Sequence, residues 1–307
     1  MATYYVGVDV GGTTIKMGLF SDVGELLEKW EIPTGKEDDG EHVIADIADS
    51  MEEKRASFGG NIKGIGIGIP GPVTDDGIVL KCPNLPWGIF PVKDTLIRIT
   101  GIGNVRVGND ANVAALGEMW KGGGRGYDSI VMVTLGTGVG GGIIQKGKIV
   151  TGGHGAAGEI GHIKVNINET ERCGCGNYGC LEQYVSASGI VRMAKAGLKP
   201  ESCLAKASRI TAKKVFDGAK QNDAYCKEVV DMFGRYLGLA LSNIAHIADP
   251  EAFVIGGGVS AAGTVILDLV KKNYSGYSMY AIRDTEIRLA ELGNDAGIYG
   301  AVRMVLF

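Results

Sequence analysis

The segment Asn109-Asp110-Ala111-Asn112 has the residue types with the clearest capacity for catalysis. An apolar strand pattern over 105–108 precedes it, and a helical pattern over 111–120 follows. Ligands of α/β folds bind at such strand ends, where a carboxylate can take the proton of a hydroxyl that attacks a phosphate. The segment would serve equally as a helix N-cap, because Asp and Asn oxygens accept hydrogen bonds from the free N–H groups of a helix start. Both roles stay open for Asp110.

A second group of residues has the donors of a metal site. Cys173, Cys175 and Cys180 have the spacing C-x-C-x₄-C, and His162 lies upstream of them. Three thiolates and one imidazole make a closed tetrahedral set that is typical of structural zinc. His154 is an alternative fourth ligand, and a reactive dithiol or uninvolved thiols are the alternative to a metal. A zinc-bound His162 would keep a second ring nitrogen for a ligand.

Two glycine-rich segments, Asp9-Val10-Gly11-Gly12-Thr13 and Leu135-Gly136-Thr137-Gly138, have the composition of phosphate loops. Glycine lets backbone N–H groups approach phosphate oxygens closely, and threonine adds a hydroxyl donor. Neither segment is a Walker A loop or a dinucleotide fingerprint, because each leads into another strand pattern. A single such segment would be equally consistent with a tight turn. Together with Gly256-Gly257-Gly258, which follows a third strand pattern, they favour nucleotide binding.

Strand and helix patterns alternate along the chain, which predicts an α/β fold. We expect strands over 4–20 and 129–145, each interrupted by a glycine turn, and over 62–69, 105–108 and 252–255. The helical patterns cover 41–57, 111–120, 225–248, the residues from 260 onward, and 297–306. The two glycine turns begin at Gly11 and Gly136, and this repetition predicts two similarly built halves.

The length and composition limit the classes of protein to which this chain can belong. The 307 residues are enough for about two domains. A formal net charge of -4 and a pI near 5.7 argue against a nucleic-acid or anionic-membrane partner. We find neither the pattern of a signal peptide at the N-terminus nor an apolar run of the ~20 residues that a membrane helix needs. We therefore expect a cytoplasmic protein, in which clustered cysteines favour metal binding over disulfides.

Taken together, these motifs resemble those of the ROK family (repressors, open reading frames and kinases) among the actin-like sugar kinases. The resemblance covers nearly the whole chain and includes Gly68-Ile69-Pro70-Gly71-Pro72 and Glu159-Ile160-Gly161-His162. It implies an α/β, actin-like (ribonuclease H-like) fold of two domains. The smaller N-terminal domain would comprise 1–117 joined by the C-terminal helix 294–307. The larger domain, 118–293, would hold the zinc knuckle.

The resemblance also implies an ATP-dependent phosphorylation of a hexose at its 6-hydroxyl, with Asp110 as general base. It implies that the hexose is bound by Gly71, Asn109, Asp110, Glu159, His162 and Glu182. It implies that ATP and Mg²⁺ are bound by Asp9, Gly11, Gly12, Thr13, Lys16, Gly136, Thr137, Gly138, Gly257 and Gly258. Structural Zn²⁺ would be bound by His162, Cys173, Cys175 and Cys180.

The stretch 109–118 is most similar to the ROK glucokinases, so glucose is the expected hexose. Kinases for N-acetylmannosamine, N-acetylglucosamine or fructose remain alternatives, and ATP or polyphosphate remain alternative phosphate donors. A sugar-responsive repressor is disfavoured because only eight residues precede Asp9, too few for a DNA-binding segment. A binding module without turnover is disfavoured because the base and both phosphate loops are present. The family further implies a homodimer or a homotetramer.

Overall fold

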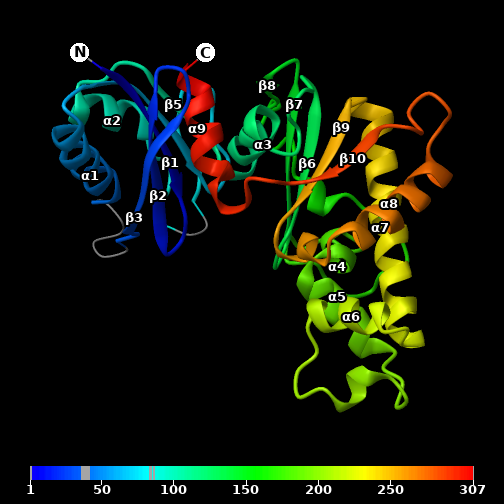
Figure 1. Cartoon of the computed structure of the whole chain (residues 1–307). Coiled ribbons are helices and arrows are strands. Elements are labelled where there is room, and N and C mark those ends of the chain that lie inside the picture. The colour runs from blue at the N-terminus through cyan, green and yellow to red at the C-terminus, as the bar shows by residue number, and fades with distance from the viewer. Residues whose placement is uncertain (1, 36–41, 83–84, 86, 307) are drawn as a thin grey trace. The chain divides into compact units, whose positions relative to one another are not determined.

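The computed structural model describes residues 2–35, 42–82, 85 and 87–306 (Figure 1). Its strands are β1 (Thr3–Val10), β2 (Thr14–Ser21), β3 (Leu26–Pro33), β4 (Asn61–Ile69), β5 (Val105–Asn109), β6 (Ile130–Leu135), β7 (Val139–Gln145), β8 (Lys148–Ile149), β9 (Ala252–Gly256) and β10 (Glu286–Leu289). Its α-helices are α1 (Val43–Phe58), α2 (Val92–Thr100), α3 (Asp110–Lys121), α4 (Glu182–Val185), α5 (Ala187–Ala196), α6 (Ala212–Lys220), α7 (Ala224–Ala248), α8 (Thr264–Tyr277) and α9 (Ala296–Leu306). Short 3₁₀ helices include η2 (Ile160–His162), η3 (Cys203–Lys206) and η4 (Gly258–Ala262).

The described strands form two five-stranded sheets with the same strand order. The first sheet runs β3-β2-β1-β4-β5, and the second runs β8-β7-β6-β9-β10. In each sheet, the second and third strands lie on one side of the first strand, and the fourth and fifth strands lie on its other side. The α/β class is confirmed, and so is the expectation that two similarly built halves each carry one glycine turn.

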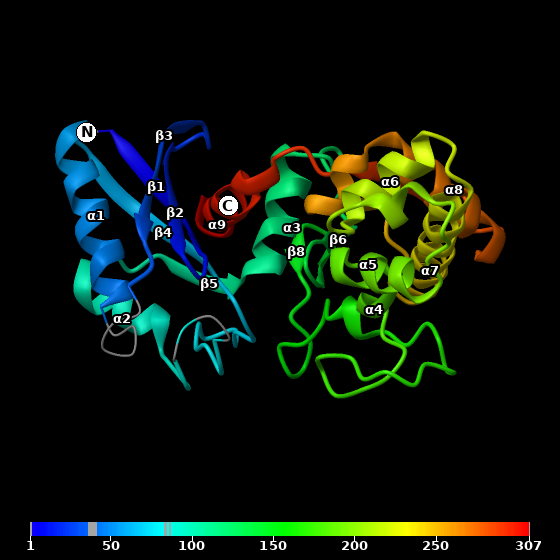
Figure 2. The same cartoon turned by 90° about the horizontal axis from the view of Figure 1, so that it is seen from below.

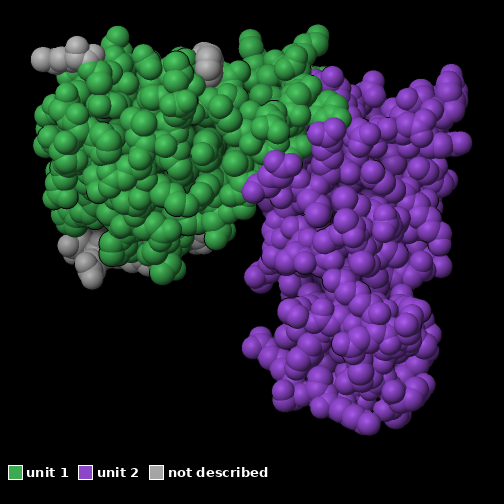
Figure 3. Space-filling view, viewed as in Figure 1, with its two compact units in different colours: residues 1–128, 142–158, 292–307 green, residues 129–141, 159–291 purple. Residues whose placement is uncertain are grey.

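The chain packs into two compact units, which Figure 3 shows in different colours. The first comprises 1–128, 142–158 and 292–307, and the second comprises 129–141 and 159–291. The boundary therefore passes through β7 (Val139–Gln145). The division into the domains 1–117 with 294–307, and 118–293, stays a prediction.

In the first unit, helices cover both faces of the sheet (Figures 1 and 2). α1 and α2 pack on one face, where Ile44, Ile47 and Leu96 join the strand residues of a fully buried apolar core. α9 packs on the other face, where Ile298 and Val302 contact Phe20 of β2. The helix expected over 41–57 begins at Val43 in the structure. Residue 41, where the expected range starts, lies outside the described residues.

The parallel strands of this sheet bring distant residues to one edge. β1 pairs with β4 in parallel, with Asp9 opposite Gly68, and β4 pairs with β5 in parallel, with Ile69 opposite Asn109. The C-terminal ends of the three strands consequently lie side by side. Ligands of α/β sheets bind at this kind of edge.

In the second unit, α7 and α8 lie against each other, and the ring of Tyr274 in α8 meets Phe253 of β9 edge to face at 5.9 Å. α7 ends at Ala248, directly before Asp249-Pro250, as expected, and the C-cap residue Asp249 adopts a left-handed conformation. The helix expected from Ser260 differs in detail. Residues Gly258–Ala262 form the 3₁₀ helix η4, and α8 begins only at Thr264, because Gly263 has a φ of 80° that interrupts the helix.

No helix within the described ranges is long and apolar enough to cross a lipid bilayer.

Candidate active site

The N-cap role that the sequence left open belongs to Asn109. Its Oδ1 accepts hydrogen bonds from the backbone N–H groups of Ala111 (3.1 Å) and Asn112 (3.2 Å). Its Nδ2 donates to the carbonyl oxygen of Gly71 at 3.1 Å and to Oδ1 of Asp110 at 3.1 Å. Asn109 thus fixes the start of α3, the loop at Gly71 and the carboxylate of Asp110 together.

Asp110 is the first residue of α3, and two hydrogen bonds orient its half-buried side chain. Oδ1 accepts from Asn109 and also from the N–H of Ala111 at 2.9 Å. A carboxylate in the first turn of a helix is stabilised in its charged form by the helix dipole. A hydrogen-bonded and partly accessible carboxylate has the properties that a general base requires.

Asp9 lies at the end of β1, at the same sheet edge as Asn109. Burial raises the pKa of Asp9 from its usual 3.8 to about 6; Lys16 acts to lower this pKa and Asp110 raises it further. Lys16 is opposite Asp9 in the β1–β2 hairpin, and its Nζ donates to the carbonyl of Asn294 at 3.3 Å. A buried carboxylate with an unfavourable charge is well suited to bind a cation.

The first glycine turn is held by a residue that the sequence did not single out. The N–H of Gly11 donates to the carbonyl of Thr14 at 3.0 Å, which closes the turn. The hydroxyl of Thr34 donates to the carbonyl of Gly11 at 2.8 Å, and its N–H donates to the carbonyl of Thr13 at 2.9 Å. Thr34 is buried and follows β3, where no motif marks it. The turn is therefore braced from β3, while Thr13 itself is exposed.

The Asp9→Asn variant tests the burial of this carboxylate. The folded chain holds the Asp9 proton up to about pH 6, whereas the unfolded chain releases it near 3.8, so the Asp9 contribution lowers stability as pH rises between these values. About two pKa units correspond to about 3 kcal/mol. We expect the variant to gain stability relative to the parent chain by about 1–3 kcal/mol above pH 6 and to gain little at pH 4. Urea unfolding at several pH values measures the difference.

Asp22→Asn is the control, because it replaces an exposed aspartate of the same unit. A stability difference between Asp9→Asn and the parent chain that stayed constant from pH 4 to 8 would contradict the assignment.

The second glycine turn is anchored by α5 and by Glu182. The N–H of Gly136 donates to the carbonyl of Gly138 at 3.0 Å, and the hydroxyl of Ser188 donates to the carbonyl of Thr137 at 2.6 Å. The N–H of Val139 donates to Oε2 of Glu182 at 3.0 Å. Glu182, half-buried at the start of α4, thereby contacts the loop directly.

A pocket of about 690 Å³ opens beside this second turn. Its volume lies in the range of small-molecule sites. It is lined by Gly136, Thr137, Ala187, Thr211, Ala212, Lys213, Phe216, Asp217, Lys220, Gly258, Val259, Ala261 and Ala262. Gly136, Thr137 and Gly258 are among the residues that the sequence predicts to bind nucleotide, whereas the α6 residues are not.

Gly257 explains how the third glycine segment approaches the second. It has a φ of 85°, and a Cβ on it would lie 2.6 Å from the carbonyl oxygen of Leu135. Only glycine allows the end of β9 to pass this close to the end of β6. The neighbouring Gly258 consequently reaches the pocket beside Gly136 and Thr137.

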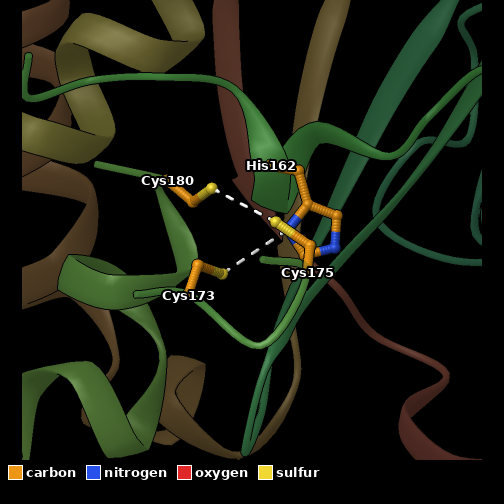
Figure 4. Close-up of side chains that lie close together, drawn as sticks. All are labelled: His162, Cys173, Cys175 and Cys180. Carbon is orange, nitrogen blue, oxygen red and sulfur yellow. Dashed lines mark hydrogen bonds between the residues drawn. The ribbon is translucent and has the colours of Figure 1, made fainter. Parts of the chain in front are cut away.

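The four expected metal ligands converge in the second unit (Figure 4). Sγ of Cys173 lies 3.9 Å from Nδ1 of His162, and Sγ of Cys175 lies 3.6 Å from Sγ of Cys180. All four donor atoms lie within 4.8 Å of one another. A tetrahedral zinc with Zn–S bonds of about 2.3 Å places its sulfur ligands roughly 3.7 Å apart. The donor set and its spacing therefore fit zinc.

The local chain builds this cluster as a tight knuckle. The N–H of Cys173 donates to the carbonyl of Asn177 at 2.7 Å, and the N–H of Gly176 donates to the carbonyl of Cys173 at 2.9 Å. Burial raises the pKa of Cys180 to about 12, so a bound cation is needed for its thiolate to form at neutral pH.

Glu182 connects the knuckle with the second glycine turn. Sγ of Cys173 lies 3.7 Å from Oε1 of Glu182, whose other oxygen accepts from Val139. Glu159 precedes the 3₁₀ helix η2, where its carbonyl accepts from the N–H of His162 at 3.1 Å, and its side chain is exposed. The first unit thus gathers Asp9, Lys16, Gly71, Asn109 and Asp110, and the second gathers His162, Glu182 and the cysteines.

Comparison with known proteins places the chain in one family. The ROK family model matches residues 5–306. The glucokinase of Halalkalibacterium halodurans is 46% identical, over 97% of this chain and 93% of the relative. The ROK hexokinase of Thermus thermophilus has a TM-score of 0.84 at 32% identity, covering 98% of this chain and 97% of its own.

A ROK family glucokinase from Streptomyces griseus, solved in complex with glucose and AMPPNP, has a TM-score of 0.75 at 35% identity. The alignment covers 98% of this chain and 99% of that protein. The fold is that of the actin-like sugar kinases, as the motifs implied. The chain belongs to the ROK family.

Proposed function

We propose that this protein is a glucokinase that transfers the γ-phosphoryl group of ATP to the 6-hydroxyl of glucose. One observation carries the proposal. An ordered carboxylate, Asp110, lies at a sheet edge beside a glycine turn, in a chain related over nearly its whole length to glucokinases. Phosphoryl transfer needs a positioned base and electrostatic stabilisation of the transferred group, and this edge supplies both.

Asp110 acts as the general base. Its carboxylate takes the proton of the 6-hydroxyl as the oxygen attacks the γ-phosphorus, and Asn109 holds it in position through the hydrogen bond to Oδ1. The amide of Asn109 is occupied by Gly71, Asp110 and the start of α3, so we assign it mainly to orienting the base and the loop at Gly71.

We assign phosphate binding to Gly11, Gly12, Thr13 and Lys16, and also to the Gly136–Gly138 turn. Asp9 would hold Mg²⁺, because its buried carboxylate is relieved by a cation. Mg²⁺ supplies charge neutralisation at the β- and γ-phosphates when it is bound. The adenosine would occupy the pocket between α6 and Gly258, with Gly257 at its border.

We assign glucose binding to Gly71, Asn109, Asp110, Glu159, His162 and Glu182. His162, Cys173, Cys175 and Cys180 would hold a structural Zn²⁺, which fixes the knuckle. Cys173 is a thiolate when it ligates zinc, and it then donates no proton to Oε1 of Glu182. Oε1 becomes available to a sugar hydroxyl, so zinc binding and sugar binding support each other.

We assign the protein to the cytoplasm, as a homodimer or homotetramer without a nucleic-acid partner. Sedimentation analysis of the purified protein tests the assembly.

A coupled assay decides the substrate. ATP is offered with glucose, mannose, fructose, N-acetylglucosamine and N-acetylmannosamine, and polyphosphate replaces ATP in a parallel series. We expect glucose with ATP to give the highest kcat/KM, because a pocket built for a hydroxyl pattern discriminates strongly against substituted sugars. A higher kcat/KM for an N-acetylated sugar would move the assignment to another hexose kinase. If none of the sugars is phosphorylated, the proposed hexose kinase activity is refuted.

A further inference from the structure

Two cysteines outside the zinc knuckle lie beside each other in the second unit. Cys203 begins the 3₁₀ helix η3, and Cys226 lies in the first turn of α7. Their Sγ atoms are 3.9 Å apart. Cys203 is exposed, whereas Cys226 is completely buried. Neither residue belongs to the motifs that mark the ROK family.

The neighbouring Asp223 does not complete a metal site. Its oxygens accept from the backbone N–H of Cys203 at 2.7 Å and from that of Cys226 at 2.8 Å. The hydroxyl of Ser202 lies 3.1 Å from both oxygens. The carboxylate is thus engaged as the N-cap of α7 and as the anchor of η3. The two thiols alone are too few for the three or four protein ligands of a zinc site.

We propose that Cys203 and Cys226 are a redox-sensitive dithiol that forms a disulfide when the protein meets a hydroperoxide. The exposed Cys203 reacts first. Its thiolate attacks the terminal oxygen of hydrogen peroxide, the O–O bond breaks, and a sulfenic acid and hydroxide form. The Cys226 sulfur then attacks the sulfenic sulfur, the S–O bond breaks, and water leaves as the S–S bond forms. Two thiols and one peroxide give one disulfide and two waters.

The order of these steps follows from burial. Burial, with the Asp223 carboxylate beside it, raises the pKa of the Cys226 thiol to about 12. Cys226 therefore stays protonated and shielded from peroxide in the reduced protein. As its sulfur attacks the oxidised Cys203, its proton passes to the departing hydroxide, and Cys226 serves as the resolving residue. The side chains need to approach from 3.9 Å to the ~2.05 Å of an S–S bond.

Formation of the disulfide would change the shape of the pocket that we assign to adenosine, so this part of the inference rests on the proposed function. Gly218 of α6 lies against both sulfurs, since a Cβ on it would be 2.5 Å from Sγ of Cys226 and 2.9 Å from Sγ of Cys203. The same helix lines the pocket with Lys213, Phe216 and Lys220. Movement of the sulfurs therefore moves the packing surface of α6, and we expect weaker nucleotide binding.

The test treats the full, zinc-loaded protein with one equivalent of hydrogen peroxide and maps its disulfides by peptide mass spectrometry. We expect a Cys203–Cys226 peptide pair, lost on reduction with dithiothreitol, with zinc content unchanged. Calorimetry with ATP should show Kd raised at least about threefold, while Kd for glucose stays constant. Cys203→Ser should abolish both responses and keep basal activity, whereas Cys82→Ala, which removes a cysteine of the first unit, should retain both.

Disulfide mapping does not depend on catalysis, so it separates this inference from the proposed kinase activity. Absence of the peptide pair would overturn the dithiol assignment. A second zinc per chain that disappears in Cys203→Ser would overturn it in favour of a metal site. An oxidised protein with unchanged Kd for ATP would overturn the link to the pocket.

Discussion

Replacing Asp110 with Asn should lower kcat for glucose phosphorylation by about three orders of magnitude, because general bases contribute roughly 10²–10⁴ to rate. Asn keeps the size of the side chain and an oxygen that can accept from the N–H of Ala111. It cannot accept the proton of the attacking hydroxyl. The dissociation constants for glucose and ATP should stay within about threefold, because the lost interaction is made mainly in the transition state.

Calorimetry with each ligand and a coupled assay for kcat separate these quantities. Asp94→Asn is a matched control, since Asp94 lies in the first turn of another helix of the same unit and is exposed. It should leave kcat unchanged. A kcat for Asp110→Asn within tenfold of the parent chain would exclude Asp110 as the base.

The fold was predictable where local pattern alone decides it. Both glycine turns follow apolar strands and lead into further strands, and the structure places each turn between the first two strands of its half. The C-x-C-x₄-C spacing likewise identified a cluster that the fold closes with His162. Such features depend on residues close together in sequence, so the sequence displays them.

Other parts of the site depend on tertiary packing and left no motif. Thr34 braces the first glycine turn only because β3 returns beside β2, and its residue type is ordinary for the end of a strand. Phe216 and Lys213 line the large pocket because α6 packs near η4, yet their spacing is that of any amphipathic helix. The division of roles between Asn109 and Asp110 also needed geometry, since both residue types suit a cap.

Loss of one zinc ligand should be the second large effect, because it removes the metal that holds the knuckle and Glu182 in place. Cys180→Ser substitutes a buried ligand of the cluster. We expect zinc per chain to fall well below one equivalent. The Tm should fall by about 3–5 °C, since a loss of 2–3 kcal/mol shifts Tm by roughly this amount in a chain of this size. KM for glucose should rise at least about tenfold, because without zinc the Cys173 thiol donates to Oε1 of Glu182 and occupies the oxygen that we assign to a sugar hydroxyl.

Elemental analysis, calorimetric melting and the coupled assay measure the three quantities, with Cys82→Ala as a control outside the cluster. Removal of zinc from the parent chain by a chelator should reproduce the lower Tm and higher KM, and added zinc should restore both. In Cys180→Ser added zinc should restore neither, because three remaining donors no longer close the tetrahedron. A chelated parent chain with unchanged Tm and KM would show instead that the knuckle holds its shape through its own hydrogen bonds, from Cys173 to Asn177 and from Gly176 to Cys173.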